Sequence, residues 1–188
     1  MENGSLKVLG IAGSLRKDSF NKKVLAELKS HAPTGVQVTT FSLDAVPLFN
    51  ADDEEGGDPD EVAYFKKLID EHDALYIVTP EYSHGMPGVL KNALDWAGSV
   101  TNTNVLAKKP AAVAGASPAP LGTALAQVQV KQTLAATGAY VVEQPEVFIG
   151  KVQNQINENG EFASEEMINL LRRSLQALHH RYLQMQKS

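Results

Sequence analysis

The chain has 188 residues, no cysteine and a formal net charge of −5. This length suits one ordinary domain, so we expect a single domain over residues 1–188. The mild negative charge argues against a nucleic-acid partner, and the lack of cysteine excludes disulfides, thiolate nucleophiles and iron–sulfur clusters. No apolar run is long enough to cross a bilayer, so we expect no membrane insertion. A cysteine-free composition also fits a cytoplasmic protein.

Strand-like and helix-like patterns alternate from the first residues onward. Residues 6–12 form a short apolar run, and helical periodicity follows over residues 21–30. Residues 36–43 then alternate apolar and polar side chains, as a strand near a sheet edge does. The acidic loop over residues 47–57 is interpreted as a solvated surface segment.

Helix-start signals and a fully apolar run mark the next part of the chain. Asp58 is a candidate capping residue, Pro59 suits a first helical turn, and Glu61 has capping-box spacing. Residues 74–79 are apolar almost throughout, which is typical of a central parallel strand. The pair at 87–88, proline then glycine, opens another predicted helix.

The second half continues the same alternation. Residues 110–116 read as a strand and residues 122–137 as a helix. A fifth strand is predicted at 139–142, interrupted near a proline and resumed at 147–149. The last helix is predicted to begin at Ser164, followed by two glutamates that suit its positive end.

This alternation predicts an α/β fold, a flavodoxin-like three-layer sandwich with a five-stranded parallel sheet of order 2-1-3-4-5. In that order, ligands bind at the carboxyl ends of the strands where chain direction reverses. Three loops open there, after Ala12, Thr79 and Ala116.

The first of these loops has the composition of a phosphate-binding site. Residues 13–21 supply the hydroxyls of Ser14 and Ser19, the guanidinium of Arg16 and the amide of Asn21 at a helix start. Neither the glycine-rich dinucleotide fingerprint nor the P-loop is present, so a single monophosphate such as that of FMN fits best. In the alternative interpretation, Ser19 only caps the helix and Arg16 is a surface residue.

The second loop contains two prolines and two glycines that allow its backbone to approach a flat ligand. Tyr82, His84 and Met86 are candidates for an aromatic and apolar wall. Ser83 and His84 are adjacent, which rarely makes a nucleophile–base pair, and no nucleophile elbow surrounds them. We therefore expect a flavin wall here and no hydrolytic pair.

The third loop, residues 115–122, contains Ser117, which is within reach of a flavin edge or ribityl chain. A rigid proline-rich connection is the alternative.

No metal site is expected, because the adjacent His179 and His180 of the last helix point about 100° apart.

Together the first two loops resemble the NADPH-dependent FMN reductase family, which includes quinone reductases, chromate reductases and some azoreductases. Residues 13–21 match every fixed position of a signature close to G-S-L-R-x-x-S-x-N. Residues 80–96 match all but one position of P-E-Y-N-x-x-x-P-G-x-L-K-N-A-[IL]-D-W. The departure is Ser83, where relatives commonly have asparagine.

The resemblance implies two groups of cofactor-binding residues. Those expected around the FMN phosphate are Ser14, Arg16, Ser19, Asn21 and the backbone amide of Phe20. Those expected along the isoalloxazine are Pro80, Glu81, Tyr82 and Ser83, with Ser117 as a further flavin contact.

The resemblance also implies an NAD(P)H-dependent oxidoreductase that uses FMN and takes NADPH or NADH as donor. Two electrons would pass by hydride transfer at flavin N5 to a small-molecule acceptor, such as a quinone, free flavin, an azo compound or chromate. The cofactor carries this chemistry, so no catalytic side chain is expected. Isologous dimers are usual among relatives, and we expect a homodimer or homotetramer here. The alternative function is a flavodoxin-like electron carrier without NAD(P)H activity.

Overall fold

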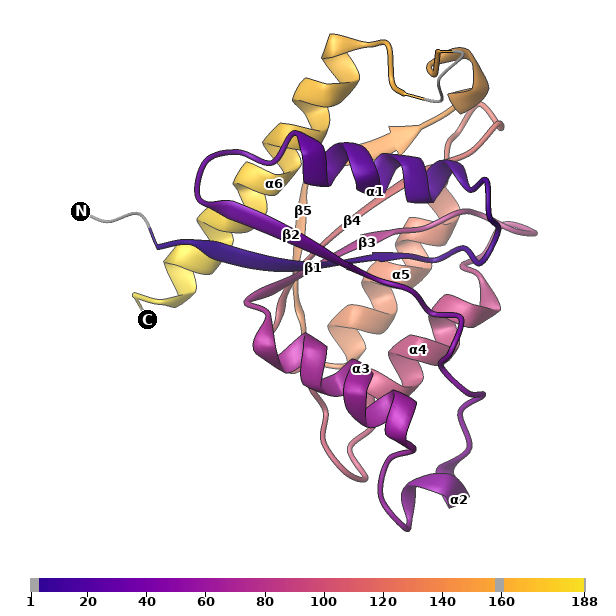
Figure 1. Cartoon of the computed structure of the whole chain (residues 1–188), viewed down its shortest axis with the longest axis vertical. Coiled ribbons are helices and arrows are strands. Elements are labelled where there is room, and N and C mark those ends of the chain that lie inside the picture. The colour runs from indigo at the N-terminus through magenta and orange to yellow at the C-terminus, as the bar shows by residue number, and fades with distance from the viewer. Residues whose placement is uncertain (1–3, 158–160, 188) are drawn as a thin grey trace.

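A parallel sheet lies between two layers of helices in the computed structural model, which describes residues 4–157 and 161–187 (Figure 1). The sheet has five strands in the order β2-β1-β3-β4-β5, which confirms the predicted flavodoxin-like topology. The strands are β1 Leu6–Ala12, β2 Val36–Phe41, β3 Ala74–Val78, β4 Pro110–Ala116 and β5 Tyr140–Ile149.

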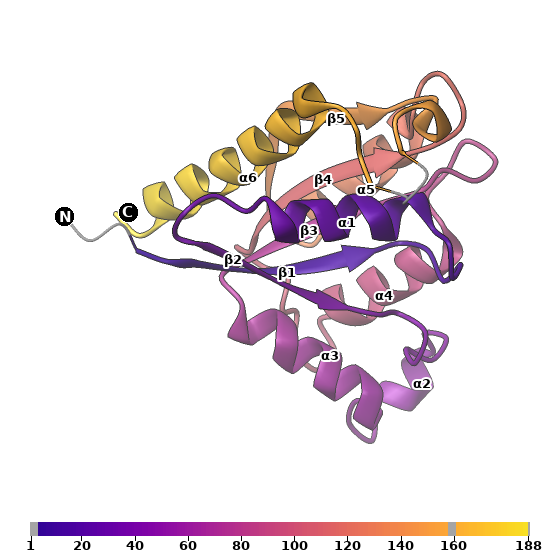
Figure 2. The same cartoon turned by 45° about the horizontal axis from the view of Figure 1, so that its top comes forward.

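Helices cover both faces of the sheet, as a parallel sheet requires. They are α1 Phe20–Ser30, α2 Ala51–Glu54, α3 Asp60–Glu71, α4 Gly88–Gly98, α5 Ala124–Ala136, α6 Glu165–Met185 and the 3₁₀ turn η1 Val152–Asn154. Figure 2 shows α1 and α6 on one face, with α3 and α4 on the other. Helix α5 packs on the same side as α4.

Successive strand side chains enter two different cores. In β3, Tyr76 and Val78 pack into the core under α1 and α6, while Leu75 and Ile77 pack into the core under α3, α4 and α5. All five β3 residues are buried. The continuous apolar run of this strand thus follows from its two covered faces.

Two predicted helix starts are confirmed by their caps. The Ser19 hydroxyl accepts hydrogen bonds from the amides of Asn21 and Lys22 at 3.2 and 3.4 Å, at the start of α1. The Ser164 hydroxyl accepts one from Met167 at 3.3 Å, at the start of α6. Each side chain satisfies amides that the first helical turn leaves without partners.

The predicted cap at Asp58 is wrong. Helix α3 follows Pro59 and has no side-chain cap. The carboxylate of Asp58 instead lies 2.9 Å from the ammonium of Lys66, whose side chain is only 5% exposed. A buried ammonium needs a counter-charge, and this requirement outweighs a single capping hydrogen bond.

The acidic loop is also not simply solvated. It contains the short helix α2, and its Glu54 is buried. One Glu54 oxygen accepts a hydrogen bond from Ser99 at 2.7 Å, and the other lies 3.8 Å from Lys66. These contacts attach the loop to α3 and to the residue that follows α4.

Smaller differences concern where elements end. Strand β2 ends at Phe41, the last residue paired with β1, rather than at residue 43. Helix α5 begins at Ala124 rather than at residue 122. Strand β5 runs without a break, because a register shift against β4 accommodates the segment around Pro145.

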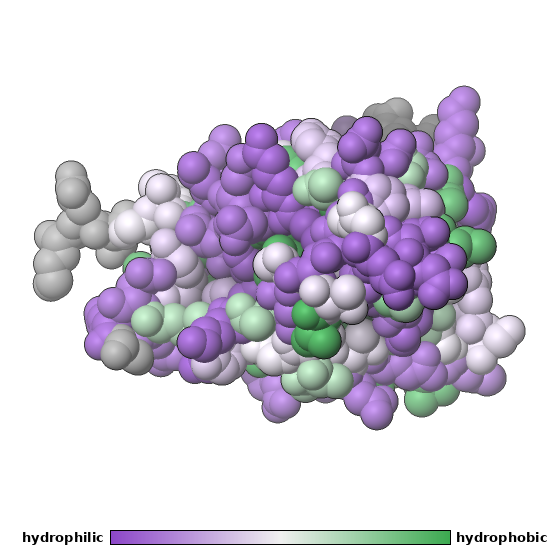
Figure 3. All heavy atoms as spheres, turned by 90° about the horizontal axis from the view of Figure 1, so that it is seen from below, coloured by the Kyte–Doolittle hydropathy of each residue, from purple (hydrophilic) through white to green (hydrophobic). Residues whose placement is uncertain are grey.

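The outer surface beside α2 and α3 is mostly hydrophilic, with small separate apolar patches (Figure 3). Among the described residues, no helix combines the length and the apolar composition that crossing a membrane demands.

Close approach of three elements at Gly115 yields a stability prediction. A methyl group there would collide with the hydroxyl of Thr123 and the backbone carbonyl of Thr79. Because neither neighbour can move freely, Gly115→Ala should lower the free energy of unfolding by about 3 kcal/mol. Urea titration measures this loss. The control is Gly56→Ala, since nothing lies within 4 Å of a methyl group there; equal losses in both variants would contradict the prediction.

Candidate functional site

Three loops leave the carboxyl edge of the sheet side by side. The strand ladder continues one residue past the strands, through hydrogen bonds of 2.9 Å from Gly13 to Val78 and from Thr79 to Ala114. Ser117 donates a third such bond to Ile149 at 2.9 Å. The starting points of the three loops are therefore set by the sheet itself.

A small hollow of about 50 Å³ lies between these loops. Every predicted site residue except Ser83 lines it. The lining residues are Ser14, Arg16, Ser19, Phe20, Asn21, Pro80, Glu81, Tyr82, Ala116, Ser117 and Pro118. Residues more than sixty positions apart in the sequence thus share one site.

The α1 side of the hollow has the properties of an anion site. Ser14 and Ser19 are 4% and 3% exposed, and each hydroxyl oxygen already accepts a backbone hydrogen bond. The hydroxyl hydrogens remain available as donors. The N-terminus of α1 adds its positive end. The Arg16 side chain is exposed, and no carboxylate of the described chain pairs with it within 4.0 Å.

The size of the hollow limits what it encloses. A single water occupies about 10–15 Å³ on this measure, so the hollow holds only a few atoms of that size. Drug-sized ligands usually occupy about 300 Å³ or more. The hollow is therefore large enough for a phosphate group but too small for a whole flavin nucleotide.

Asn21 connects the first loop to the third. Its side-chain nitrogen donates to the carbonyl of Ala116 at 3.0 Å, and its oxygen accepts from the amide of Ala116 at 2.8 Å. Asn21 is 3% exposed. Most of the hydrogen-bonding capacity of Asn21, which the sequence predicted to bind a phosphate, is therefore directed at the end of β4.

The second loop forms a tight two-residue turn. The amides and carbonyls of Tyr82 and Gly85 are paired at 3.1 and 2.9 Å, and Ser83 and His84 have φ values of 49° and 61°. Both central residues are left-handed, as in a type I′ turn. Asparagine, which the family signature quoted above has at this position, tolerates this conformation better than most residues. Ser83 is not among the residues that line the hollow.

Glu81 caps a helix that is distant in the sequence. One oxygen of its carboxylate accepts hydrogen bonds from the amides of Leu125 and Ala126, each at 3.0 Å. Thr123 precedes α5 without a side-chain cap. Local sequence rules miss this contact, because they search for caps only next to the helix.

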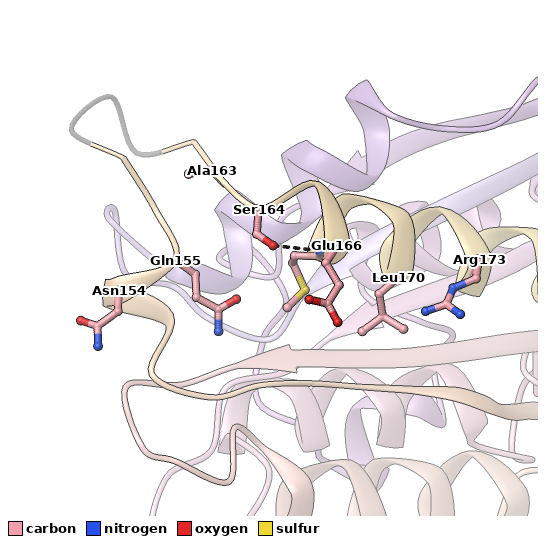
Figure 4. Close-up of a pocket in the computed structure, with 8 residues that line it drawn as sticks. Asn154, Gln155, Ala163, Ser164, Glu166, Leu170 and Arg173 are labelled. Atoms are coloured by element: carbon pink, nitrogen blue, oxygen red, sulfur yellow. Dashed lines mark hydrogen bonds between the residues drawn. The ribbon is translucent and has the colours of Figure 1, made fainter.

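A larger hollow of about 540 Å³ lies elsewhere, between the loop after η1 and the first turns of α6 (Figure 4). Its rim includes Glu166 and Arg173, with Met167 and Leu170 between them. No residue of the two motifs lines it, so the smaller hollow remains the candidate site.

Fold and site together define a flavodoxin-like protein with a small hollow, lined at the N-terminus of α1 by buried serines, at the carboxyl edge of its sheet. The family model for NADPH-dependent FMN reductases matches residues 6–154. The chain is 40% identical to an NAD(P)H-dependent FMN reductase of Pseudomonas aeruginosa, over 92% of this chain and 93% of that one. It is 39% identical to a 2-hydroxy-1,4-benzoquinone reductase of a Burkholderia species, over 86% and 88% of the two chains.

A solved structure agrees with these sequence matches. The flavoenzyme NAD(P)H:acceptor oxidoreductase FerB of Paracoccus denitrificans superposes with a TM-score of 0.87 at 32% identity, covering 95% of this chain and 98% of that one. The chain belongs to the NADPH-dependent FMN reductase family. It is accordingly an oxidoreductase with FMN as cofactor and NAD(P)H as electron donor.

The left-handed turn gives a second stability prediction. Ser83→Val places a β-branched residue at a φ of 49°, which should lower the free energy of unfolding by about 2 kcal/mol. Ser83→Asn should be neutral or slightly stabilising, because asparagine tolerates this conformation. Chemical denaturation of both variants measures the difference, and equal stability of the two would show that the turn is not held in this geometry.

Proposed function

We propose that this protein is a quinone and flavin reductase in which the α1 loop holds the FMN phosphate and the second loop supports the ring. The observation that carries the proposal is the pair of buried serine hydroxyls beside Arg16 at the N-terminus of α1, where no described carboxylate pairs with the guanidinium. This donor set suits a phosphate dianion.

When bound, FMN supplies hydride transfer at its N5, which carries two electrons from NADPH or NADH to the acceptor. The chain's own part is to bind and orient. Ser14, Arg16, Ser19 and the Phe20 amide would hold the phosphate, and Pro80 and Tyr82 would lie along the ring with Ser83 at the turn. No side chain is assigned as acid, base or nucleophile.

The range of electron acceptors depends on how accessible the flavin ring is to other molecules. Tyr82 lines the hollow and is 50% exposed, so planar molecules can reach a ring that lies against it. Quinones and free flavin are the acceptors that we propose first, with azo compounds and metal oxyanions such as chromate as further ones. A cysteine-free chain that draws on NAD(P)H also fits a cytoplasmic location.

The phosphate assignment is tested by removing its charged donor. Arg16→Ala should weaken FMN binding by about 10- to 100-fold, because a charge-assisted hydrogen bond contributes about 1.5–3 kcal/mol. Riboflavin has no phosphate, so its affinity should not change. Fluorescence titration measures both dissociation constants, with Arg172→Ala on α6 as the control. An unchanged affinity for FMN would remove Arg16 from the site.

The reductase activity is tested by an absorbance spectrum of the FMN-loaded protein under anaerobic conditions. Addition of NADPH, and of NADH in a parallel sample, should bleach the flavin promptly, and a quinone should then restore the colour. Bound flavin that neither nucleotide bleaches would favour an electron carrier instead. The faster nucleotide identifies the donor.

The last part of the proposal is that the protein associates with itself as a homodimer or homotetramer. Helix α5 exposes Leu125 at 45% and Val128 at 62%, and Leu121 precedes it. A helix that is apolar on its outer face is normally covered. A second copy is the occupant that we propose, because this face adjoins the turn at Tyr82 and its exposed side chains between Leu125 and Gln132 carry no charge. Lys131 within this stretch is only 19% exposed and lies 3.7 Å from Glu146.

A charge on this face should separate the subunits. Val128→Lys would bury an unpaired ammonium at the interface, so sedimentation velocity should show monomers where the wild type forms a larger species. Ser30→Lys, on the exposed end of α1, is the control and should leave the assembly unchanged. An oligomer that survives Val128→Lys would place the interface elsewhere.

A further inference from the structure

We propose that Asn21 and Glu81 are positioning residues, which hold the loops of the FMN site to one another rather than binding FMN. The inference rests on the proposed function, because it concerns how that site is held together. Both residues belong to the sequence motifs, where their types alone suggest ligands.

The contacts of Asn21 leave its side chain directed at the protein. It pairs with both backbone groups of Ala116, 95 residues away, through bonds of 3.0 and 2.8 Å. The side chain sits in the first turn of α1 and is buried. It therefore joins the helix start that faces the phosphate to the end of β4, from which Ser117 follows directly.

Glu81 performs the same task on the opposite side of the hollow. One carboxylate oxygen accepts from the amides of both Leu125 and Ala126. The first-turn amides of α5 lack a local side-chain acceptor, and a negative charge suits a helix N-terminus. The other oxygen lies 3.6 Å from the imidazole of His84. The carboxylate thus connects the second loop to α5.

A second contact supports this connection. The side-chain oxygen of Gln129, one turn further along α5, accepts from the amide of Met86 at 3.0 Å. The turn over residues 82–85 is therefore held to α5 on both sides, at Glu81 and at Met86. Asn21 and Glu81 together link all three loops into one unit around the hollow.

Positioning and direct binding predict different ligand specificities. A phosphate ligand matters only for a flavin that has a phosphate, as expected for Arg16. A residue that orients the backbone at Ala116 also affects the loop carrying Ser117, which lines the ring side. Loss of either Asn21 or Glu81 should therefore weaken binding of riboflavin as well as FMN.

The first test compares dissociation constants of FMN and riboflavin in wild type, Arg16→Ala, Asn21→Ala, Glu81→Ala and Glu81→Gln. Arg16→Ala should lose affinity for FMN alone, whereas Asn21→Ala and Glu81→Ala should lose about tenfold for both ligands. Glu81→Gln should recover most of this loss, because one amide oxygen can accept from both helix amides.

The second test needs no flavin. Amide hydrogen exchange in the ligand-free protein should accelerate at Ala116 in Asn21→Ala, and at Leu125 and Ala126 in Glu81→Ala. The matched control is Ser174→Ala, which removes a buried hydrogen bond to Tyr76 on the α6 side. It should lower stability without changing either flavin affinity, which separates positioning from general destabilisation.

Several outcomes would overturn the inference. If Asn21→Ala weakened FMN binding and left riboflavin unchanged, Asn21 would be a phosphate ligand. If Glu81→Gln lost as much affinity as Glu81→Ala while amide exchange at Leu125 and Ala126 stayed as slow as in wild type, the charge of Glu81 would act on the ring directly. A wild type that binds neither flavin would refute the proposed function, and unaltered exchange at Ala116, Leu125 and Ala126 would refute the positioning role independently.

Discussion

The hydrogen-bond ladder of the three central strands is the constraint on which the site depends. It continues past β1, β3 and β4 through Gly13, Thr79 and Ser117, and so starts three loops in one row. The carboxyl ends of parallel strands lie at the same edge, so the sheet alone brings together loops that are far apart in the sequence. The serine hydroxyls at the start of α1, the turn at Tyr82 and the capping carboxylate of Glu81 all lie at this common edge.

Polar side chains in this protein fix the conformations of the loops to a greater extent than the sequence motifs suggest. Ser19 caps α1 through two amides and still has a hydroxyl hydrogen to donate. The same double use occurs on the other face of the sheet, where Glu54 and Asp58 surround Lys66 and hold the segment after β2. Buried polar groups must find partners, so each of them restricts the backbone that supplies the partner.

Much of the architecture was predictable because its signals are local. The apolar run of β3 and the serine caps of α1 and α6 depend only on neighbouring residues and on periodicity. Two of the errors share one cause. Asp58 and Glu54 looked like a helix cap and a solvated acid, but both respond to Lys66, which lies 8 and 12 positions further along the chain.

The sequence by itself determined the fold class, the strand order and the composition of the loops at the carboxyl edge. Hydrophobic periodicity and helix-start residues are short-range properties that the sequence shows directly. All carboxyl ends of a parallel sheet lie at one edge, so the loops that follow them meet there. Only the tertiary structure decided which way the polar groups in those loops point. Asn21 and Glu81 have their hydrogen-bond partners 95 and 44 residues away, and no spacing rule along the chain measures the distance between such groups. The direction of a side chain is settled by which unsatisfied backbone groups the fold brings beside it.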